Sequence, residues 1–240
     1  MMERTDFGRA LALAAIFAIA ACGGTEQTTN TPVDTGSSGK QSSSAELEAE
    51  IGGMEEAKVQ SAFERTSSKL TECFTEGTKR IPFLGGDVRF ALRVGKDGTA
   101  RVAYLKESTL GDRETEACML GAVRAASWPA PVGGKEGLAE GGFSFDPSAD
   151  ERPAVALEPD KLGKELPKAK DAIARCRSSV GGGPVKVTMY IGTNGKPLAV
   201  GLSSADDKGD QAATCIVDAL REMKFPSPGS YAGKVTITTD

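Results

Sequence analysis

Histidine is absent from all 240 positions of the sequence. Ser-His and Cys-His nucleophile pairs therefore cannot form, and imidazole is missing as a metal ligand. A basic excess is missing too, because 29 Lys and Arg stand against 33 Asp and Glu, for a net charge of -4. Together these absences predict a protein that is not an enzyme and that has no metal, no cofactor and no nucleic-acid partner.

Long hydrophobic runs are scarce, and the longest lies near the amino terminus. The run ALALAAIFAIAA spans 10–21, follows Arg4 and Arg9, and is too short to cross a bilayer stably. Small residues then precede Cys22, which resembles the bacterial lipoprotein signal, where the cysteine is acylated and becomes the first mature residue. This resemblance implies a signal peptide over 1–21, acyl chains such as palmitate on Cys22, and the membrane as a partner. An ordinary secretory signal is the alternative.

A polar segment follows the anchor. Residues 23–44 contain one aliphatic side chain, Val33, among Gly, Ser, Thr, Asn and Gln. Such a composition buries too little apolar surface to offset the entropy of ordering, so we expect a flexible tether over 22–44. Gly23 after the cysteine resembles lipoproteins that are sorted to the outer membrane. The resemblance thus implies an outer-membrane lipoprotein that faces the periplasm, with exposure on the cell surface as an open alternative.

The rest of the chain contains an internal repeat. A shift of 97 residues aligns 88–131 with 185–228 without a gap. The shift superimposes SWPAP at 127–131 on KFPSP at 224–228, each at the same distance behind a predicted helix. Structural punctuation that stops the helix is therefore favoured over a polyproline ligand for a partner's aromatic groove.

Both copies have the same predicted elements. The strands VRFALRV and VKVTMYI alternate apolar and polar residues, and the Asp97-Gly98 and Asn194-Gly195 pairs after them are typical of two-residue hairpin turns. Asp112 is the expected cap of the second helix in the first copy. The expected helices are 54–76, 113–127, 160–178 and 210–224, and the expected strands are 88–94, 100–106, 142–145, 185–191, 197–203 and 234–239.

This order of elements predicts an α+β fold. We expect two tandem helix-strand-strand-helix-strand units, each a small three-stranded antiparallel sheet packed with two helices. The first unit should span 45–146 and the second 158–240, with 147–157 as the linker. The acidic side chains Glu55, Glu56, Glu114 and Glu116 are expected to be charges on helix surfaces, and the acidic stretch 206–210 lacks the spacing of a calcium loop.

Four cysteines remain after Cys22, and they allow three connectivities. One cysteine falls on each expected helix, so the repeat favours disulfides between Cys73 and Cys118 and between Cys176 and Cys215. Export to an oxidising compartment would allow both bonds to form. A redox-active thiol pair is the alternative, but no Cys-x-x-Cys spacing supports it.

Several short motifs of the first copy carry a family resemblance over about 54–146. The pattern resembles the carboxy-terminal domain of myxobacterial gliding-motility envelope proteins, itself similar to the TonB carboxy-terminal domain. The second copy, 158–239, keeps fewer of the motifs and resembles a diverged member. TonB's retained inner-membrane helix and proline-rich spacer are missing, so energy transduction is not expected. The motifs are Cys73-Phe74, Pro82-x-Leu84-x-Gly86, Asp97-Gly98, Ser108-Thr109-Leu110, Glu116-x-Cys118 and Trp128-Pro129-x-Pro131.

A small three-stranded sheet must expose its edges, and an exposed edge can accept a strand from a partner. TonB-like domains capture peptides in this way, so the resemblance points to the closing strand and to Lys234, Thr236 and Thr238 as partner-binding residues. An edge that is only protected, or is covered by the neighbouring domain, is the alternative. The expected function is a lipid-anchored cell-envelope protein with a non-catalytic peptide- or protein-binding role. A structural or assembly component of an envelope motility or transport complex is the alternative.

Overall fold

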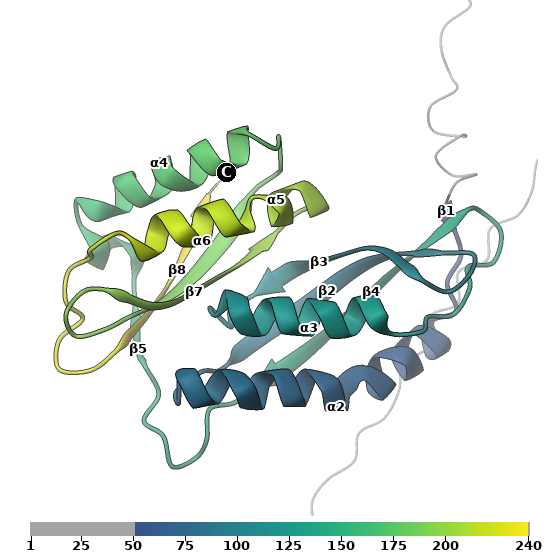
Figure 1. The fold of residues 1–240 in the computed structure, drawn as a ribbon, viewed down its shortest axis with the longest axis horizontal. Helices are drawn as coiled ribbons and strands as arrows, with labels where there is room; N and C mark the ends of the chain where they lie inside the picture. The colour runs from purple at the N-terminus through teal and green to yellow at the C-terminus, as the bar shows by residue number, and fades with distance from the viewer. Residues whose placement is uncertain (1–50, 240) are drawn as a thin grey trace, which may run out of the picture. The chain divides into compact units, whose positions relative to one another are not determined.

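The computed structural model describes residues 51–239 (Figure 1). The expected signal peptide, Cys22 and the tether 22–44 lie outside the described residues. The described part contains five α-helices and two β-sheets, so the expected α+β class is confirmed. We call residues 51–145 the first half and residues 155–239 the second half.

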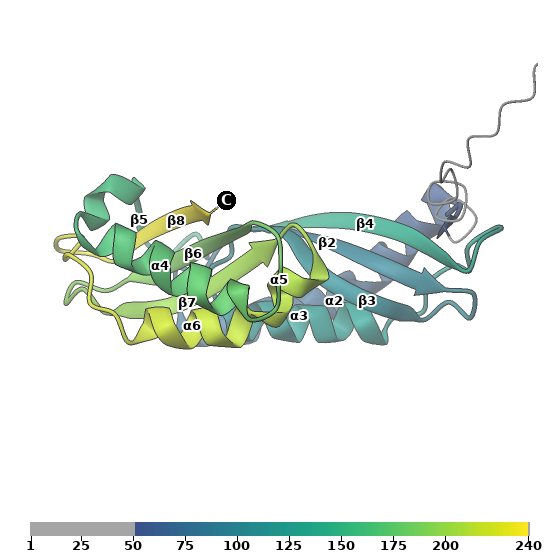
Figure 2. The same ribbon diagram turned by 90° about the horizontal axis from the view of Figure 1, so that it is seen from above.

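The first half is a four-stranded sheet with two helices. The strand order is β1-β4-β2-β3, with β2 antiparallel to both neighbours and β1 parallel to β4. Helices α2 and α3 lie side by side on one face of this sheet (Figures 1 and 2). The elements are β1 (Ile51–Gly52), α2 (Glu56–Arg80), β2 (Gly86–Gly95), β3 (Ala100–Ser108), α3 (Arg113–Ala125) and β4 (Glu136–Phe145).

Helical spacing of apolar residues places the core of the first half. On α2 the buried side chains recur every three or four residues and form a stripe that faces the sheet. Helix α3 begins where expected, because the Asp112 side chain accepts a hydrogen bond from the Thr115 N–H. The stripe on α2 consists of Val59, Ala62, Phe63, Thr66, Leu70, Cys73 and Gly77.

The second half is also a four-stranded sheet covered by helices. Its strand order is β5-β8-β6-β7, with β6 antiparallel to both neighbours and β5 parallel to β8. The elements are β5 (Val155–Leu157), the 3-10 helix η1 (Pro159–Leu162), α4 (Glu165–Ser178), β6 (Val185–Ile191), β7 (Pro197–Ser204), α5 (Asp207–Gln211), α6 (Ala213–Arg221) and β8 (Gly233–Thr239).

Three expectations about these elements need correction. Each sheet has four strands instead of three, because the short strands β1 and β5 pair with the closing strands β4 and β8. The helix expected over 160–178 is interrupted at Gly163, whose φ of 54° is left-handed. The helix expected over 210–224 consists of α5 and α6, and it begins earlier because the Asp206 side chain caps α5 by accepting from the Gly209 N–H.

The two hairpin turns are longer than expected. Gly98 donates its N–H to the Gly95 carbonyl, and Gly95 donates to the Thr99 carbonyl, so residues 96–98 form a three-residue loop. Gly98 takes a left-handed φ of 73°, and Gly195 has φ 79° at the matching place in the second half. Glycine is needed at both positions because this conformation is unfavourable for residues with a Cβ.

The aromatic-Pro-x-Pro segments pack against these turns. Trp128 donates its N–H to the Gly98 carbonyl, and Phe225 donates to the Gly195 carbonyl at 2.8 Å. Both aromatic side chains are buried. The aromatic residue of KFPSP is therefore a core residue that ties the end of a helix to a hairpin turn, which fits the structural reading of the motif.

Disulfide bonds join the two helices of each half. Cys73 on α2 is bonded to Cys118 on α3, and Cys176 on α4 is bonded to Cys215 on α6, each with a Cα–Cα distance of 5.7 Å. These are the pairs that the repeat favours, so disulfide bonding is confirmed.

Candidate functional site

The closing strand β8 is not the free edge that the sequence suggested. Strand β5 pairs with it at Gly233–Val235 and covers the beginning of its outer side. The Lys234 ammonium donates a hydrogen bond to the Gly85 carbonyl at 2.7 Å and lies 5.2 Å from the centre of the Tyr190 ring. Partial burial lowers the pKa of Lys234. Lys234 is thus a contact between the two halves, so its ammonium group is already bound within the chain, and its role in partner binding stays a prediction.

Thr236 and Thr238, the other two residues of the predicted binding edge, make fewer contacts than Lys234. The hydroxyl groups of Thr236 and Thr188 lie 3.0 Å apart and form a hydrogen bond, while Thr238 is exposed. The expected alternation is present, since Val235 and Ile237 are buried. Only the end of β8 beyond the strand β5 therefore remains open on this side in the described part of the chain.

Tyr190 fixes the second half to the first. This β6 side chain is buried, and its hydroxyl donates to the Gly85 carbonyl at 3.1 Å and accepts from the Gly85 N–H at 3.2 Å. The Phe83 ring lies 5.5 Å from the Tyr190 ring. Burial raises the pKa of Tyr190 to about 12, so the hydroxyl keeps its proton and donates at neutral pH.

Glu116 makes a second contact between the halves, and its placement corrects the expectation of a helix-surface charge. The side chain is fully buried, and its carboxylate accepts from the Ser108 hydroxyl at 2.7 Å and from the Leu202 N–H at 2.9 Å. Burial raises the pKa of Glu116 to about 7. The carboxylate therefore satisfies a backbone donor of β7 and blocks the edge of this strand.

An ion pair accompanies this contact. Arg113, at the start of α3, lies 2.9 Å from an Asp210 carboxylate oxygen on α5, and Arg124 lies 3.7 Å from the other oxygen. The Asp210 side chain is 14% exposed, so solvent screens the pair less than it screens an ordinary surface ion pair. The acidic stretch 206–210 thus has a structural role in capping and docking.

The outer edge of β4 has no strand partner beyond its first two residues within 51–239. Strand β1 pairs with β4 only at Glu136 and Gly137. The chain then turns away, because Gly53 and Val132 exchange backbone hydrogen bonds of 2.9 and 2.8 Å. Residues 138–145 of β4 pair with β2 on the inner side alone.

The hydrogen-bond pattern shows which β4 groups face outward. Gly95 donates to Thr99, and Asp87 accepts from the Thr109 N–H, so the odd-numbered residues of β2 face β3. The even-numbered residues of β2 then face β4, where their partners are odd-numbered. The outward N–H and C=O groups of β4 therefore belong to Leu138, Glu140, Gly142 and Ser144.

A groove of about 350 Å³ lies between this edge and the first turns of α2. Its floor contains Phe63, whose ring is so close to the β4 backbone that a Cβ atom at Gly141 would lie 2.5 Å from it. Phe143, half-buried, lies 6.1 Å from the Phe63 ring. The groove is lined by Glu56, Val59, Gln60, Phe63, Glu64, Glu140, Gly141, Gly142 and Phe143.

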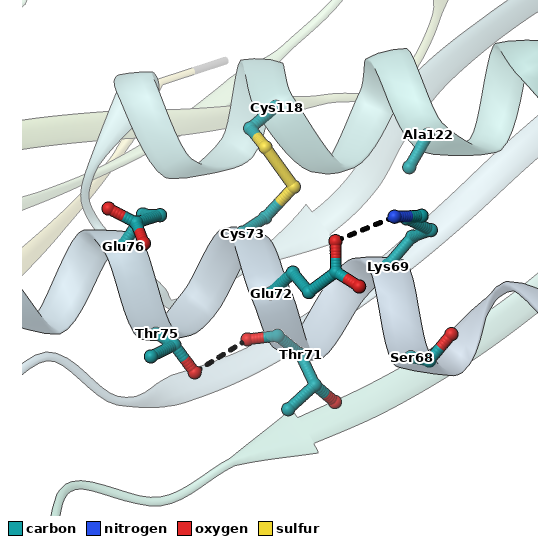
Figure 3. Close-up of a pocket in the computed structure, with 9 residues that line it drawn as sticks. All are labelled: Ser68, Lys69, Thr71, Glu72, Cys73, Thr75, Glu76, Cys118 and Ala122. Atoms are coloured by element: carbon teal, nitrogen blue, oxygen red, sulfur yellow. Dashed lines mark hydrogen bonds and ion pairs between the residues drawn. A yellow bond between two sulfur atoms is a disulfide. The ribbon is translucent and has the colours of Figure 1, made fainter.

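A larger depression of about 730 Å³ lies along α2 and α3, beside the first disulfide (Figure 3). Cys73 is buried, while Cys118 is exposed at this surface. Charged side chains of the lining pair within α2, since the Lys69 ammonium lies 2.8 Å from a Glu72 carboxylate oxygen. The depression therefore offers an open helix surface without a converging set of ligands.

Sequence reasoning missed both Glu116 and the β4 groove. The spacing of Glu116 from Met119, Leu120 and Val123 places it on the buried face of α3, and this signal could have identified it. The edge of β4 could not be found in this way, because its partners are set by tertiary pairing.

Known proteins give no further guidance. Comparisons with protein family models, with curated proteins and with solved structures find no match. Among the described residues, no group of three or more Cys, Asp or Glu side chains is arranged to hold a metal ion. None of the helices within 51–239 combines the length and the hydrophobicity that a membrane span requires.

Proposed function

We propose that this chain is a lipid-anchored cell-envelope protein that binds an extended segment of a protein partner without catalysis. The partner segment is added as a strand to the outer edge of β4. The observation that carries this proposal is a row of outward backbone groups at Leu138, Glu140, Gly142 and Ser144 that have no strand partner within 51–239 and lie beside an apolar groove.

The other strand edges are less accessible to a partner strand than the outer edge of β4. Glu116 occupies the β7 edge at Leu202, and strand β5 covers the start of β8. Strand β3 lies against β7. Edge strands that are left open invite pairing with another chain, so the open stretch of β4 is the best-placed acceptor in the described residues.

The proposal also covers the relation between the two halves and the anchor at Cys22. The two halves are tandem copies of one domain that resembles the TonB carboxy-terminal domain, and Cys22 holds them at the outer membrane through a tether. Two observations support the repeat: equivalent strands have the same order in both sheets, and the disulfides join equivalent helices.

Backbone capture can be tested at a single residue. Gly142 donates its N–H outward, so Gly142→Pro removes one donor of the edge while leaving the pairing with β2 intact. The full chain, purified in detergent, is tested against an array of extended peptides of about eight residues, the length of the open edge. We expect amide hydrogen exchange to slow at 138–145 on binding, and Gly142→Pro to weaken binding about tenfold.

Thr238→Pro is the matched control, because this exposed residue lies on the outer side of β8 and also donates outward. It should leave binding unchanged. Wild-type affinity in a folded Gly142→Pro protein, or equal losses in both variants, would show that β4 is not the acceptor.

A further inference from the structure

We infer that the strand accepted by β4 is cationic, with lysine or arginine at two positions four residues apart and an aliphatic side chain midway between them. This inference rests on the proposed function and adds the chemistry of the partner. It follows from the charges and the spacing of the groove between α2 and β4.

The groove has an acidic rim around an apolar floor. Three glutamates are among its lining residues, Glu56, Glu64 and Glu140, and none of its lining residues is lysine or arginine. Glu140 is already paired with Lys106 at 2.5 Å, on the side of the sheet away from α2. Glu56 and Glu64 are exposed on α2, so they supply the charge that an incoming strand would meet.

The spacing of these two carboxylates matches that of a strand. Glu56 and Glu64 are two helical turns apart, about 12 Å along the helix axis. Residues i and i+4 of an extended strand face the same side and are about 13 Å apart. A strand that lies on β4 can therefore place one basic side chain at each glutamate.

The apolar floor between Glu56 and Glu64 determines which side chain fits at residue i+2 of the added strand. Val59 and Phe63 are buried on α2, and Phe143 on β4 is half-buried. Residue i+2 of the added strand faces this apolar surface, so an aliphatic side chain there buries area without leaving a polar group unpaired. A polar side chain at the same place would lose water without gaining a partner.

Three labelled peptides test the chemistry. Each alternates threonine with a varied residue, and the varied residues are Lys-Val-Lys, Gln-Val-Gln or Glu-Val-Glu. We expect the lysine peptide to bind the full chain about tenfold more tightly than the glutamine peptide, and the glutamate peptide to bind most weakly. The lysine preference should shrink at high salt, because exposed charges are screened.

A charge reversal supplies the matched variants. Glu56→Lys with Glu64→Lys should reverse the order, so that the glutamate peptide binds best. Glu72→Lys with Glu76→Lys changes the same helix by the same charge, at residues that line the other depression, and should keep the original order. Both pairs of positions are exposed, so the variants are expected to fold.

The outcomes separate the two claims. Equal affinities for all three peptides, with the amides of 138–145 protected, would overturn the cationic preference and leave strand addition standing. A preference for the glutamate peptide in the wild-type chain would overturn it too. Binding of no peptide at 138–145 would refute the proposed function itself, and the inference with it.

Discussion

Replacing Glu116 with glutamine is expected to remove a pH dependence that one buried carboxyl group gives to this protein. The Glu116 side chain is fully buried at the contact between the halves. Burial raises its pKa from 4.5 to about 7, although hydrogen bonds from the Ser108 hydroxyl and the Leu202 N–H, and the charge of Arg113, act in the opposite direction. Glutamine has the same shape and keeps an acceptor for the Leu202 N–H.

The direction of the effect follows from proton binding. The folded protein holds the Glu116 proton up to about pH 7, whereas the unfolded chain releases it near pH 4.5. Between these values the folded state binds more protons, so the free energy of unfolding falls as the pH rises. Each pKa unit corresponds to about 1.4 kcal/mol, so the total loss is at most about 3 kcal/mol. The loss is absent below pH 4.5 and complete above pH 7.

Urea denaturation of wild type and Glu116→Gln at about pH 4 and about pH 8 measures this loss. We expect similar stabilities at the acidic pH, and a variant that is more stable by about 2 to 3 kcal/mol at the basic pH. Thermal unfolding should then differ by about 4 to 12 °C. The difference between the two proteins is the measured quantity, because other titrating groups contribute equally to both.

Glu114→Gln serves as the control for this experiment. Glu114 lies two residues earlier on α3, is exposed, and pairs with Arg80 at 3.2 Å. Glu114→Gln removes the same charge, but from an exposed carboxyl group. The difference in stability between this variant and wild type should therefore not increase from the acidic to the basic pH. If the difference in the free energy of unfolding between Glu116→Gln and wild type stays constant from about pH 4 to about pH 8, the argument that burial raises the pKa of Glu116 is refuted.

Three further predictions concern anchoring, the first disulfide and the contact between the halves. Cys22→Ala should release the chain from membranes, and retention of this variant after a carbonate wash would contradict lipid anchoring. Replacing both Cys73 and Cys118 with serine should lower the free energy of unfolding by about 4 kcal/mol at most, as measured in urea. Tyr190→Phe removes the hydroxyl that binds both backbone groups of Gly85 and should destabilise the protein by about 1 to 3 kcal/mol; an unchanged denaturation midpoint would mean that these hydrogen bonds do not contribute.

The long elements could be predicted because their patterns are local. The alternation in 88–94 predicted the strand found at Gly86–Gly95, and the helix expected over 54–76 is found at Glu56–Arg80. The 97-residue repeat then predicted the equivalent elements of the second half. It also favoured the cysteine pairs, since each pair joins two helices that pack on one sheet.

The short strands and the open edge could not be predicted in this way. Strands β1 and β5 have two and three residues, which is too few for an alternating pattern to be recognised. Without β5, the closing strand β8 looks like an edge, and the TonB resemblance then points to Lys234, Thr236 and Thr238 as the binding residues. Pairing between segments far apart in the sequence decides which edge stays open, and periodicity carries no information about such pairing.

The contact between the halves explains a difference between the two repeats. At equivalent positions, 97 residues apart, the first copy has Arg93 where the second has Tyr190, and Tyr104 where the second has Gly201. Arg93 is exposed, whereas Tyr190 and Gly201 are buried.

Each replacement in the second copy suits a surface that the first copy covers. Tyr190 brings an aromatic ring and a hydroxyl that matches the Gly85 backbone. A Cβ atom at Gly201 would collide with the Glu116 carboxylate, so glycine lets Glu116 approach β7 and accept the Leu202 N–H. This face of the second half therefore packs against the first half, and the two halves differ at the residues that make the contact. Under the proposed function, the first half, with its long helix α2 and its β4 edge without a strand partner within 51–239, is the half that would bind the partner.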